Sequence, residues 1–364
     1  MNNVDLNQNN KKKRFWIITG CIFVVLFLLL GFIAYFLAAD FYPAIFGEVK
    51  KPKVFELAKK SISADLCAGC ARRAIDGVYV EEALANLYPA AVIIENNIDS
   101  RPSSALAKAN LVFEAEAEGG ITRFLAVYAA GEDIDEIGPI RSARPYFVDW
   151  ARELSALFIH CGGSPEALIK IARDNIFSIN EFYNETFFWR DKHRAAPHNI
   201  YTSTENINKY LAKKEAGEGM LLSWHFKDDA PEDERTDSAQ VKIGYKTNYE
   251  VEWIYNKKTN DYIRYLAGQR HKDSNGDEIR AKNIIVQYVK AKVLDDEGRL
   301  KMEHIGSGKA LACLDGKCAA GEWRKDKSSA RTRFYNEGGE EFEFNSGVTW
   351  VEVVRPEIEL SIAN

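Results

Sequence analysis

The longest uncharged run of the chain lies near its start. Residues 15–39 are 25 consecutive positions without a charged side chain, and the basic run 11–14 precedes them. A helix needs about 20 apolar residues to cross the hydrocarbon core of a bilayer, and short basic flanks stay in the cytoplasm. The pattern predicts a cytoplasmic tail over 1–14, one transmembrane helix over 15–39, and an extracytoplasmic remainder.

A cleaved signal peptide is the alternative for this run. The apolar core of a signal peptide spans about 7–15 residues and ends in small residues, an option that Leu37-Ala38-Ala39 keeps open. Ile18-Thr19-Gly20-Cys21 resembles a lipoprotein cleavage box, but such a box follows the apolar region, whereas this one lies at its beginning. We therefore expect Cys21 to be part of the helix, and the protein to be a single-pass protein of the plasma membrane.

After a juxtamembrane segment, 40–84, the pattern changes to short strands that alternate with helices. Strands and helices interleave without strict repetition, which predicts a mixed-sheet α+β domain over residues 85–225. Apolar runs, alternation and capping signals predict the following elements: strands at 91–94, 111–117, 122–130 and 156–161, and helices at 103–110, 145–154 and 164–173.

An acidic segment broken by proline, 226–240, follows this domain. Such a composition is typical of a solvated linker. Residues 241–358 then show short alternating segments separated by turns such as Asn275-Gly276 and Asp315-Gly316, which predict a smaller, predominantly antiparallel β domain. The predicted fold class is therefore α+β, preceded by one transmembrane helix.

Composition limits the classes of partner. The chain has 364 residues, of which 46% are hydrophobic and 28% charged, enough for two domains with cores of their own. Its formal net charge is −5 and its isoelectric point is near 5.8. This balance gives no general attraction to nucleic acid, so we expect no nucleic-acid partner.

Two pairs of cysteines have spacings that suggest bridges. Cys313 and Cys318 flank the turn Asp315-Gly316, where facing hairpin positions bring Cβ atoms close enough for a disulfide. Because disulfides persist outside the cytoplasm, we predict this bridge. Cys67 and Cys70 favour a local disulfide as well, with redox exchange or half of a metal site as open alternatives.

Several short motifs occur together between residues 88 and 355. They are Glu95-Asn-Asn with Arg101-Pro, Glu118-Gly-Gly-Ile-Thr-Arg-Phe124, Ile137-Gly-Pro-Ile-Arg-Ser-Ala-Arg-Pro-Tyr146, His160-Cys-Gly-Gly-Ser-Pro165, Ala196-Pro-His-Asn-Ile-Tyr201 and Gly347-Val-Thr-Trp350. Together they make the chain resemble the YerB family of bacterial envelope lipoproteins, which has an N-terminal and a C-terminal domain of unknown function. The resemblance implies a mixed α+β fold with a smaller β-rich partner outside the membrane, and it names no reaction. Because no lipoprotein box follows the apolar run, we expect a helical anchor in place of a lipid.

Arginines recur in these motifs beside glycine and proline. A guanidinium group binds carboxylate or phosphate in a planar, two-pronged way. Structural ion pairs with Glu114, Glu116 and Glu118 are the alternative for these arginines. The candidate ligand-binding residues are Arg101, Arg123, Arg141, Arg144, His160, Gly162, Gly163, Ser164, His198 and Asn199.

The positions of two of these arginines and of one turn in the sequence predict a specific site. Arg141 and Arg144 are three residues apart before a predicted helix, and the turn 162–164 opens the next helix after a strand. Backbone N–H groups and the helix dipole favour an anion at such a position. We predict that the arginines and the turn line one anion-accepting concavity, with His160 at its edge. The alternative for the turn is a helix N-cap beside a buried histidine.

The remaining candidates are weaker. Cys161 and its strand neighbour His160 point to opposite faces, so we predict that Cys161 is a packing residue rather than a nucleophile. His198 and Asn199 are predicted to contact a polar ligand or to hydrogen-bond within their loop. Cationic side chains in 190–194 repel a metal ion, so no metal and no cofactor is expected. A set of aromatic residues is either a glycan platform or strand core: Tyr249, Trp253, Tyr255, Tyr262 and Tyr265.

The sequence supports two hypotheses of function. The leading one is a membrane-anchored binding or scaffolding module for an anionic or polar envelope polymer, such as cell-wall glycan, or for a wall-remodelling envelope protein. The alternative is an envelope hydrolase or transferase, in which Glu118 or Glu114 acts as general acid or base with His160 or His198. The chain shows no Ser-His-Asp order, zinc signature or cofactor loop, so the binding module is favoured.

Overall fold

The computed structural model describes residues 69–129 and 131–363. The predicted cytoplasmic tail, the predicted transmembrane helix and Cys67 lie outside the described residues. Within the described part of the chain, no helix is both long enough and apolar enough to cross a membrane.

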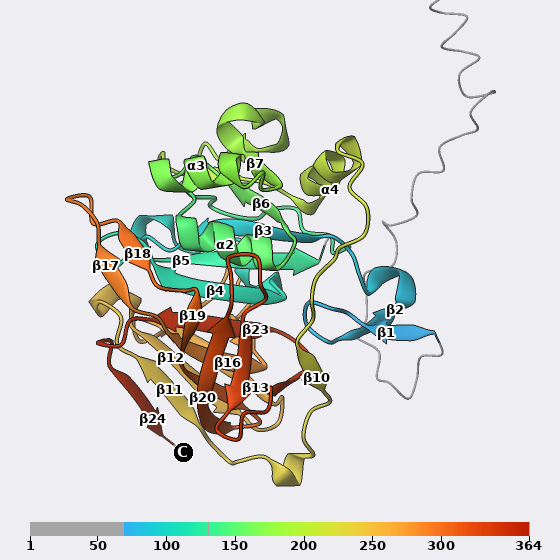
Figure 1. Cartoon of the computed structure of the whole chain (residues 1–364), viewed down its shortest axis with the longest axis vertical. Helices are drawn as coiled ribbons and strands as arrows, with labels where there is room; N and C mark the ends of the chain where they lie inside the picture. Colours follow the sequence, from blue (N-terminus) through green and yellow to red (C-terminus); the bar gives the residue numbers. More distant parts are fainter. Residues whose placement is uncertain (1–68, 130, 364) are drawn as a thin grey trace, which may run out of the picture. The chain divides into compact units, whose positions relative to one another are not determined.

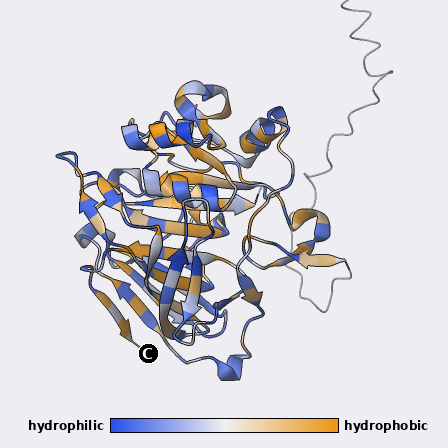
Figure 2. Ribbon diagram, in the orientation of Figure 1, coloured by the Kyte–Doolittle hydropathy of each residue, from blue (hydrophilic) through white to orange (hydrophobic). Residues whose placement is uncertain are grey.

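The central element is a mixed sheet of ten strands (Figure 1). Five strands come from the first half of the chain and five from the second. In spatial order they are β21 (Arg333–Asn336), β20 (Lys317–Lys325), β19 (Gly306–Leu314), β16 (Asn283–Tyr288), β23 (Thr349–Val354), β4 (Leu111–Glu116), β5 (Thr122–Ala129), β3 (Pro89–Glu95), β6 (Leu157–His160) and β7 (Ser178–Asn180). Figure 2 shows that the strands at the middle of this sheet are predominantly hydrophobic, as expected for strands covered on both faces.

Strand β23 joins the two halves of the chain inside the sheet. It lies between β16 and β4 and runs parallel to both, with Val351 opposite Ile285 on one side and Phe113 on the other. All six residues of β23 are buried. The backbone hydrogen bonds of a central strand therefore hold the two halves together.

Helices pack on both faces of the sheet. Two of them, α2 (Pro145–Glu153) and α3 (Pro165–Arg173), cover one face, and α4 (Thr204–Lys213) packs on the opposite face. Trp150 of α2 stacks on Phe113 of the sheet with ring centroids 5.2 Å apart. Pro165 begins α3 and the Ser164 side chain caps it by accepting from the Ala167 N–H at 3.3 Å, so the two helices predicted at 145–154 and 164–173 are confirmed.

The helix predicted at 103–110 is shortened to one 3-10 turn, η4 (Leu106–Lys108). Ala105 has a φ of 64°, which an α-helix does not accommodate. The Asp273 carboxylate, from the second half of the chain, accepts the N–H groups of Leu106 and Ala107 at 3.1 and 2.7 Å. A tertiary contact therefore caps this turn in place of further helix.

A second, antiparallel sheet packs on the opposite face of the ten-stranded sheet. Its strands are β14 (Gln269–Arg270), β13 (Asp261–Leu266), β12 (Val251–Asn256), β11 (Gln240–Ile243) and β24 (Leu360–Ala363), with β15 (Arg280–Ala281) beside β13. Trp253 of this sheet meets Trp350 of β23 at 5.2 Å between ring centroids. Trp253, Tyr255 and Tyr262 are buried, so strand core is confirmed for them, and Tyr249 is buried in the turn η8. A glycan platform on these four residues is therefore wrong.

Short elements complete the described chain. The paired strands are β1 (Cys70–Arg72) with β2 (Tyr79–Glu81), β8 (Trp189–Arg190) with β9 (Ile200–Tyr201), β10 (His225–Lys227) with β22 (Glu343–Asn345), and β17 (Ala291–Val293) with β18 (Leu300–Met302). The remaining 3-10 turns are η2 (Glu82–Leu84), η3 (Ile98–Ser100), η5 (Glu181–Tyr183), η6 (Glu185–Phe187), η7 (Glu232–Glu234) and η8 (Thr247–Tyr249). The chain is thus mostly sheet with few helices, with a mixed-sheet first half and a β-rich second half. In that second half β16–β23 and β10–β22 are nevertheless parallel pairs.

The disulfide predicted between Cys313 and Cys318 is confirmed. The two cysteines face each other across the β19–β20 hairpin, and Asp315 and Gly316 at its turn both have positive φ, 54° and 75°. Two positive φ values are typical of the tight turn that matches strand twist. The second predicted bridge includes Cys67 and so is not described.

Candidate functional site

Three parallel strands end at the same edge of the large sheet. β3 runs parallel to β6, and β6 to β7. Glu95 ends β3, Cys161 follows β6 and Glu181 follows β7. In open sheets, ligands bind beyond the carboxyl ends of parallel strands. This edge, which we call the carboxyl edge, is therefore the candidate site.

Glu95 is the first anchor of the carboxyl edge. It is buried, and its two oxygens lie 2.9 Å from Arg141 Nε and 2.7 Å from His198 Nδ1. The Arg141 N–H donates to Ile93 O, and the Cys161 N–H donates to Arg141 O, so residue 141 is wedged between the ends of β3 and β6. The structure therefore brings together two predicted ligand residues, Arg141 and His198, from segments almost 60 residues apart.

Glu118 is the second anchor. One of its oxygens accepts from Arg123 at 2.9 Å and the other from Arg144. Burial acts to raise the pKa of Glu118, but the hydrogen bonds and charges of Arg144 and Arg123 outweigh it and lower that pKa below its ordinary value. Burial, followed by the charge of Arg144, lowers the pKa of Arg123 to about 10. Glu118 is thus a stable carboxylate, which is unsuited to donating a proton as a general acid.

The two anchors leave an excess of positive charge. Arg123, Arg141 and Arg144 face the carboxylates of Glu95 and Glu118. Register places Glu95 directly opposite Arg123 on the neighbouring strand. Three guanidinium groups against two carboxylates give this corner a net positive charge when His198 is neutral, so it favours an anionic ligand.

Glu181 is the third anchor, on the far side of β6. It accepts from Arg190 Nη2 at 2.8 Å and from Cys161 Sγ at 3.5 Å. Arg190 also donates to the side chain of Asn199 at 3.4 Å. Burial, with the charge of Glu181, raises the pKa of Cys161 to about 12. The thiol stays protonated at physiological pH, which agrees with a packing residue rather than a nucleophile.

His160 ends β6, but its side chain is buried and does not face the site. Its side chain is buried, its ring stacks on Phe158, and its Nδ1 lies 2.7 Å from Gly162 O. Burial lowers the pKa of His160 to about 4. The arrangement matches the alternative of a helix N-cap at Ser164 beside a buried histidine.

The predicted concavity of Arg141, Arg144 and the turn 162–164 does not form as one space. Ala143, which lies between the two arginines, donates its N–H to Gly162 O and accepts from the Ser164 N–H. Its backbone therefore fills the space that the turn was expected to offer. The two arginines turn to different carboxylates, Glu95 and Glu118, because each buried carboxylate needs its own cation.

Glu114 and Arg101 belong to the interior. Glu114 is completely buried, pairs with Arg264 of the second sheet and accepts from Thr122 Oγ1 at 2.7 Å. No path leads from it to a substrate in this structure. Arg101 donates to the carbonyl of Asn96 and lies 4.8 Å above the ring of Tyr249.

Sequence reasoning missed Glu95, Glu181 and Arg190 as site residues. The available signal was positional, because Glu95 follows the buried run 91–94 and Glu181 follows a short strand. Polar residues that follow parallel strands meet at one edge. Without knowledge of which strands are parallel, that signal could not be used.

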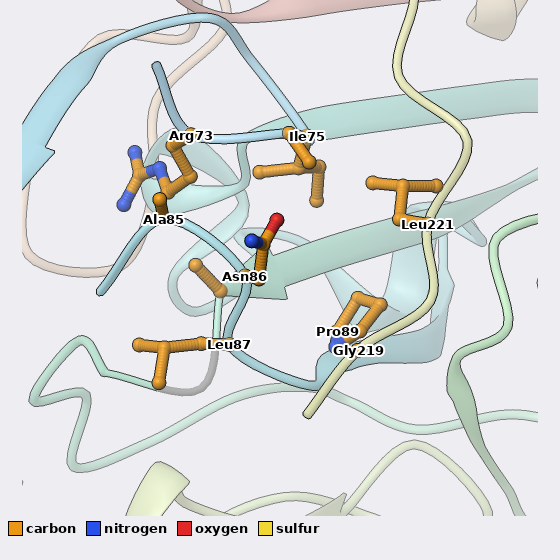
Figure 3. Close-up of a pocket in the computed structure, with 10 residues that line it drawn as sticks. Arg73, Ile75, Ala85, Asn86, Leu87, Pro89, Gly219 and Leu221 are labelled. Atoms are coloured by element: carbon orange, nitrogen blue, oxygen red, sulfur yellow. The ribbon is translucent and has the colours of Figure 1, made fainter. Parts of the chain in front are cut away.

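Two hollows lie elsewhere in the described part of the chain. Figure 3 shows a cavity beside Arg73, Ile75 and Leu221 of about 10 Å³, space for a single water molecule. A larger open hollow of about 500 Å³ lies beside the β4–β5 turn and is crossed by the Arg355–Glu116 ion pair, with Nε and Oε2 2.6 Å apart. Among the described residues there is no cluster of side chains that could hold a metal ion.

Both halves of the chain match family models. Residues 76–217 match the family described as "Protein of unknown function (DUF3048) N-terminal domain", and residues 241–351 match its C-terminal domain. The protein is therefore a two-domain member of this class. A curated relative, "Putative lipoprotein YerB" of Bacillus subtilis (strain 168), is 31% identical over 291 residues, which are 77% of this chain and 85% of the relative. The crystal structure of the YerB protein from Bacillus subtilis matches with a TM-score of 0.73 and 29% identity over 81% of this chain and 100% of that chain. The chain belongs to the YerB family, and the predicted resemblance is confirmed.

Proposed function

We propose that the protein is a membrane-anchored, extracytoplasmic binding module whose carboxyl edge holds an anionic group of an envelope polymer. The observation that carries this proposal is the set of contacts made by the Arg141 side chain. Its Nε is buried and lies 2.9 Å from Glu95, yet no hydrogen bond among the described residues engages its guanidinium group. The side chain is 24% exposed, and we infer that its two terminal nitrogens, rather than the buried Nε, donate to a ligand.

A second guanidinium supports the same site. Arg190 is 49% exposed and is held in place by Glu181. The Cys161 N–H donates to Arg141 O, and its thiol donates to Glu181, the partner of Arg190, so both arginines are linked to the residue that follows β6. Carboxylate and phosphate groups accept paired hydrogen bonds from guanidinium groups, and two of these border the same short stretch of the edge.

Replacing Arg141 with glutamine tests the site. The variant removes the positive charge and keeps a side chain beside Glu95, which retains His198 as a partner. We expect the full-length R141Q protein, in detergent, to bind isolated cell-wall polymer at least about tenfold more weakly, because a hydrogen bond to a charged group contributes about 1.5–3 kcal/mol. Sedimentation of protein with wall fragments measures this.

A matched control uses Arg173, which is 65% exposed on α3 and pairs with its neighbour Asp174. R173Q removes the same charge outside the site and should bind like the wild type. Equal weakening in both variants would mean that general charge attraction, rather than the carboxyl edge, causes binding. Melting temperatures of the three proteins show whether R141Q is folded.

The proposed topology rests on the sequence and on the lipoprotein description of the relative, and it has its own test. Residues 15–39 should remain as an uncleaved anchor, with residues 90–355 outside the membrane. In cells freed of their wall, added protease should digest the folded domains while a tag placed before residue 11 stays protected. Protection of the domains until the membrane is broken would contradict this topology.

A further inference from the structure

Two aromatic side chains beside the carboxyl edge are exposed. Phe182 is 65% exposed and Tyr183 is 84% exposed, although the largest aromatic side chains of the described chain lie in its core. Both belong to the turn η5, directly after β7. Exposed adjacent aromatic rings at a candidate site point to a ligand with apolar faces.

The turn that carries these rings is held firmly. The side-chain oxygen of Asn180 accepts the N–H of Gly162 at 2.9 Å and that of Phe182 at 3.3 Å. Glu181, between Asn180 and Phe182, is buried in its ion pair with Arg190. The rings are therefore presented from an ordered support, which lowers the entropic cost of binding.

The ring of Phe182 packs directly against Gly162. A Cβ atom at Gly162 would lie 2.8 Å from Cε2 of the Phe182 ring, and the φ of Gly162 is 61°. A larger residue would therefore push the ring away as well as strain the turn. The ring lies against the glycine and keeps most of its surface in solvent. Leu168, 38% exposed, lies against the next glycine, Gly163, and widens the apolar surface.

The aromatic surface directly adjoins the two open arginines. Arg190 is bound to Glu181, which immediately precedes Phe182. The backbone carbonyl of Arg141 accepts a hydrogen bond from the N–H of Cys161. Cys161 immediately precedes Gly162, against which the Phe182 ring packs. Each arginine is thus linked by one contact to the residue that immediately precedes Phe182 or Gly162.

We propose that the carboxyl edge binds a saccharide that carries an acidic group. This inference rests on the proposed function and adds the class of ligand. Phe182 and Tyr183 stack on the apolar C–H face of a sugar ring, while Arg141 and Arg190 bind the acid. A sugar acid presents an apolar face and a charge within one ring unit, so it matches a surface that combines aromatic rings with guanidinium groups. A protein partner would usually bury about 800 Å² on each side, and the test below separates that outcome from binding of a saccharide.

The test compares three probes on the full-length protein in detergent. An oligosaccharide of alternating N-acetylglucosamine and N-acetylmuramic acid supplies sugar and acid, chitotetraose supplies sugar alone, and poly-L-glutamate supplies acid alone. The variants are F182A/Y183A and R141Q. The control is L294A, which removes a similarly exposed apolar side chain, 50% exposed, from the second half of the chain. Affinities are measured by calorimetry.

The two variants should distinguish the contribution of the aromatic rings from that of Arg141. F182A/Y183A should bind the acidic oligosaccharide at least about tenfold more weakly, because the contact of one aromatic ring contributes about 0.5–1.5 kcal/mol and the variant removes two rings. Its affinity for poly-L-glutamate should not change. R141Q should weaken both acidic probes by a similar factor and leave chitotetraose unchanged. L294A should behave as the wild type throughout.

Other outcomes overturn specific parts. If R141Q weakens both acidic probes while F182A/Y183A binds the oligosaccharide normally, the saccharide assignment is wrong and the anion site stands. If R141Q binds both acidic probes like the wild type, the proposed function itself fails. If the wild type binds none of the probes but F182A/Y183A abolishes a cross-link to an envelope protein, the surface belongs to a protein partner and the saccharide proposal falls.

Discussion

Replacing Arg264 with methionine is expected to lower the free energy of unfolding by about 3–5 kcal/mol, the typical cost of removing one partner from a buried ion pair. Arg264 of β13 is completely buried and pairs with Glu114 of β4, so it links the two packed sheets. Its Nη1 lies 2.7 Å from Nδ1 of His271, and its guanidinium lies 5.0 Å from the ring centroid of Trp350. Methionine would fill much of the volume but would leave Glu114 without a cation.

The reason for this large effect is the neighbouring carboxyl group. Burial, with the charge of Glu114, raises the pKa of Glu352 well above its ordinary value. Glu352 is therefore neutral in the folded protein, and the side chains of Trp253 and Tyr245 donate to it at 2.8 and 3.3 Å. The cluster holds one cation for one anion, and the loss of Arg264 breaks that balance.

Urea unfolding, followed by tryptophan fluorescence, measures the loss. The double variant R264M/E114M is the matched control, because it removes the unpaired carboxylate as well and should recover part of the lost stability. A single variant that loses less than about 1 kcal/mol would show that water or a rearranged partner compensates Glu114.

Lowering the pH from 7 to 4.5 is expected to cost the wild type about 2 kcal/mol through His160 alone. The pKa of His160 is about 4 in the folded state, against an ordinary 6.5. Between these values the unfolded chain binds a proton that the folded chain does not, so stability falls as the pH drops through this window. Above pH 6.5 both states are neutral at this residue and the effect disappears.

The variant H160F isolates this contribution. Phenylalanine keeps the ring that stacks on Phe158, 5.0 Å away, and does not titrate. The difference in stability between H160F and the wild type should shift by about 2 kcal/mol in favour of H160F between pH 7 and 4.5, as measured by guanidinium unfolding. Other groups, such as Asp273, whose pKa burial raises to about 6, are common to both proteins and cancel. A constant difference across this range would show that His160 has the same pKa in the folded state as in the unfolded chain, as a solvated ring has.

Local signals in the sequence predicted the elements that depend on neighbouring residues. Ser164 followed by Pro165 starts a helix because the cap and the fixed φ act within one turn. The Cys313–Cys318 bridge was predictable because a tight turn brings the two residues together whatever surrounds the hairpin. The helix predicted at 103–110 failed because its cap, Asp273, comes from a segment more than 160 residues away.

The same distinction between local signals and tertiary contacts applies to the candidate site. The sequence indicated that Arg123, Arg141, Arg144 and His198 have a polar role, but the partner of each arginine depends on which strands are adjacent. Glu95 meets Arg141 and His198 because β3, β6 and the loop before β9 converge at one edge. His160 was expected at that edge and is buried instead, since its ring packs on Phe158 on the covered face of the sheet.

By itself the sequence determined the family, the mixed α and β content and the hairpin disulfide, because motifs, periodicity and turn residues act over a few positions. The tertiary structure decided that both halves share one ten-stranded sheet, through the pairing of β23 with β4 across more than 230 residues. It also decided which charges are buried and which stay open. Strand pairing over such distances depends on the burial of whole faces rather than on local preference, and that choice leaves the Arg141 side chain partly exposed beside Glu95 and the Phe182 ring in solvent.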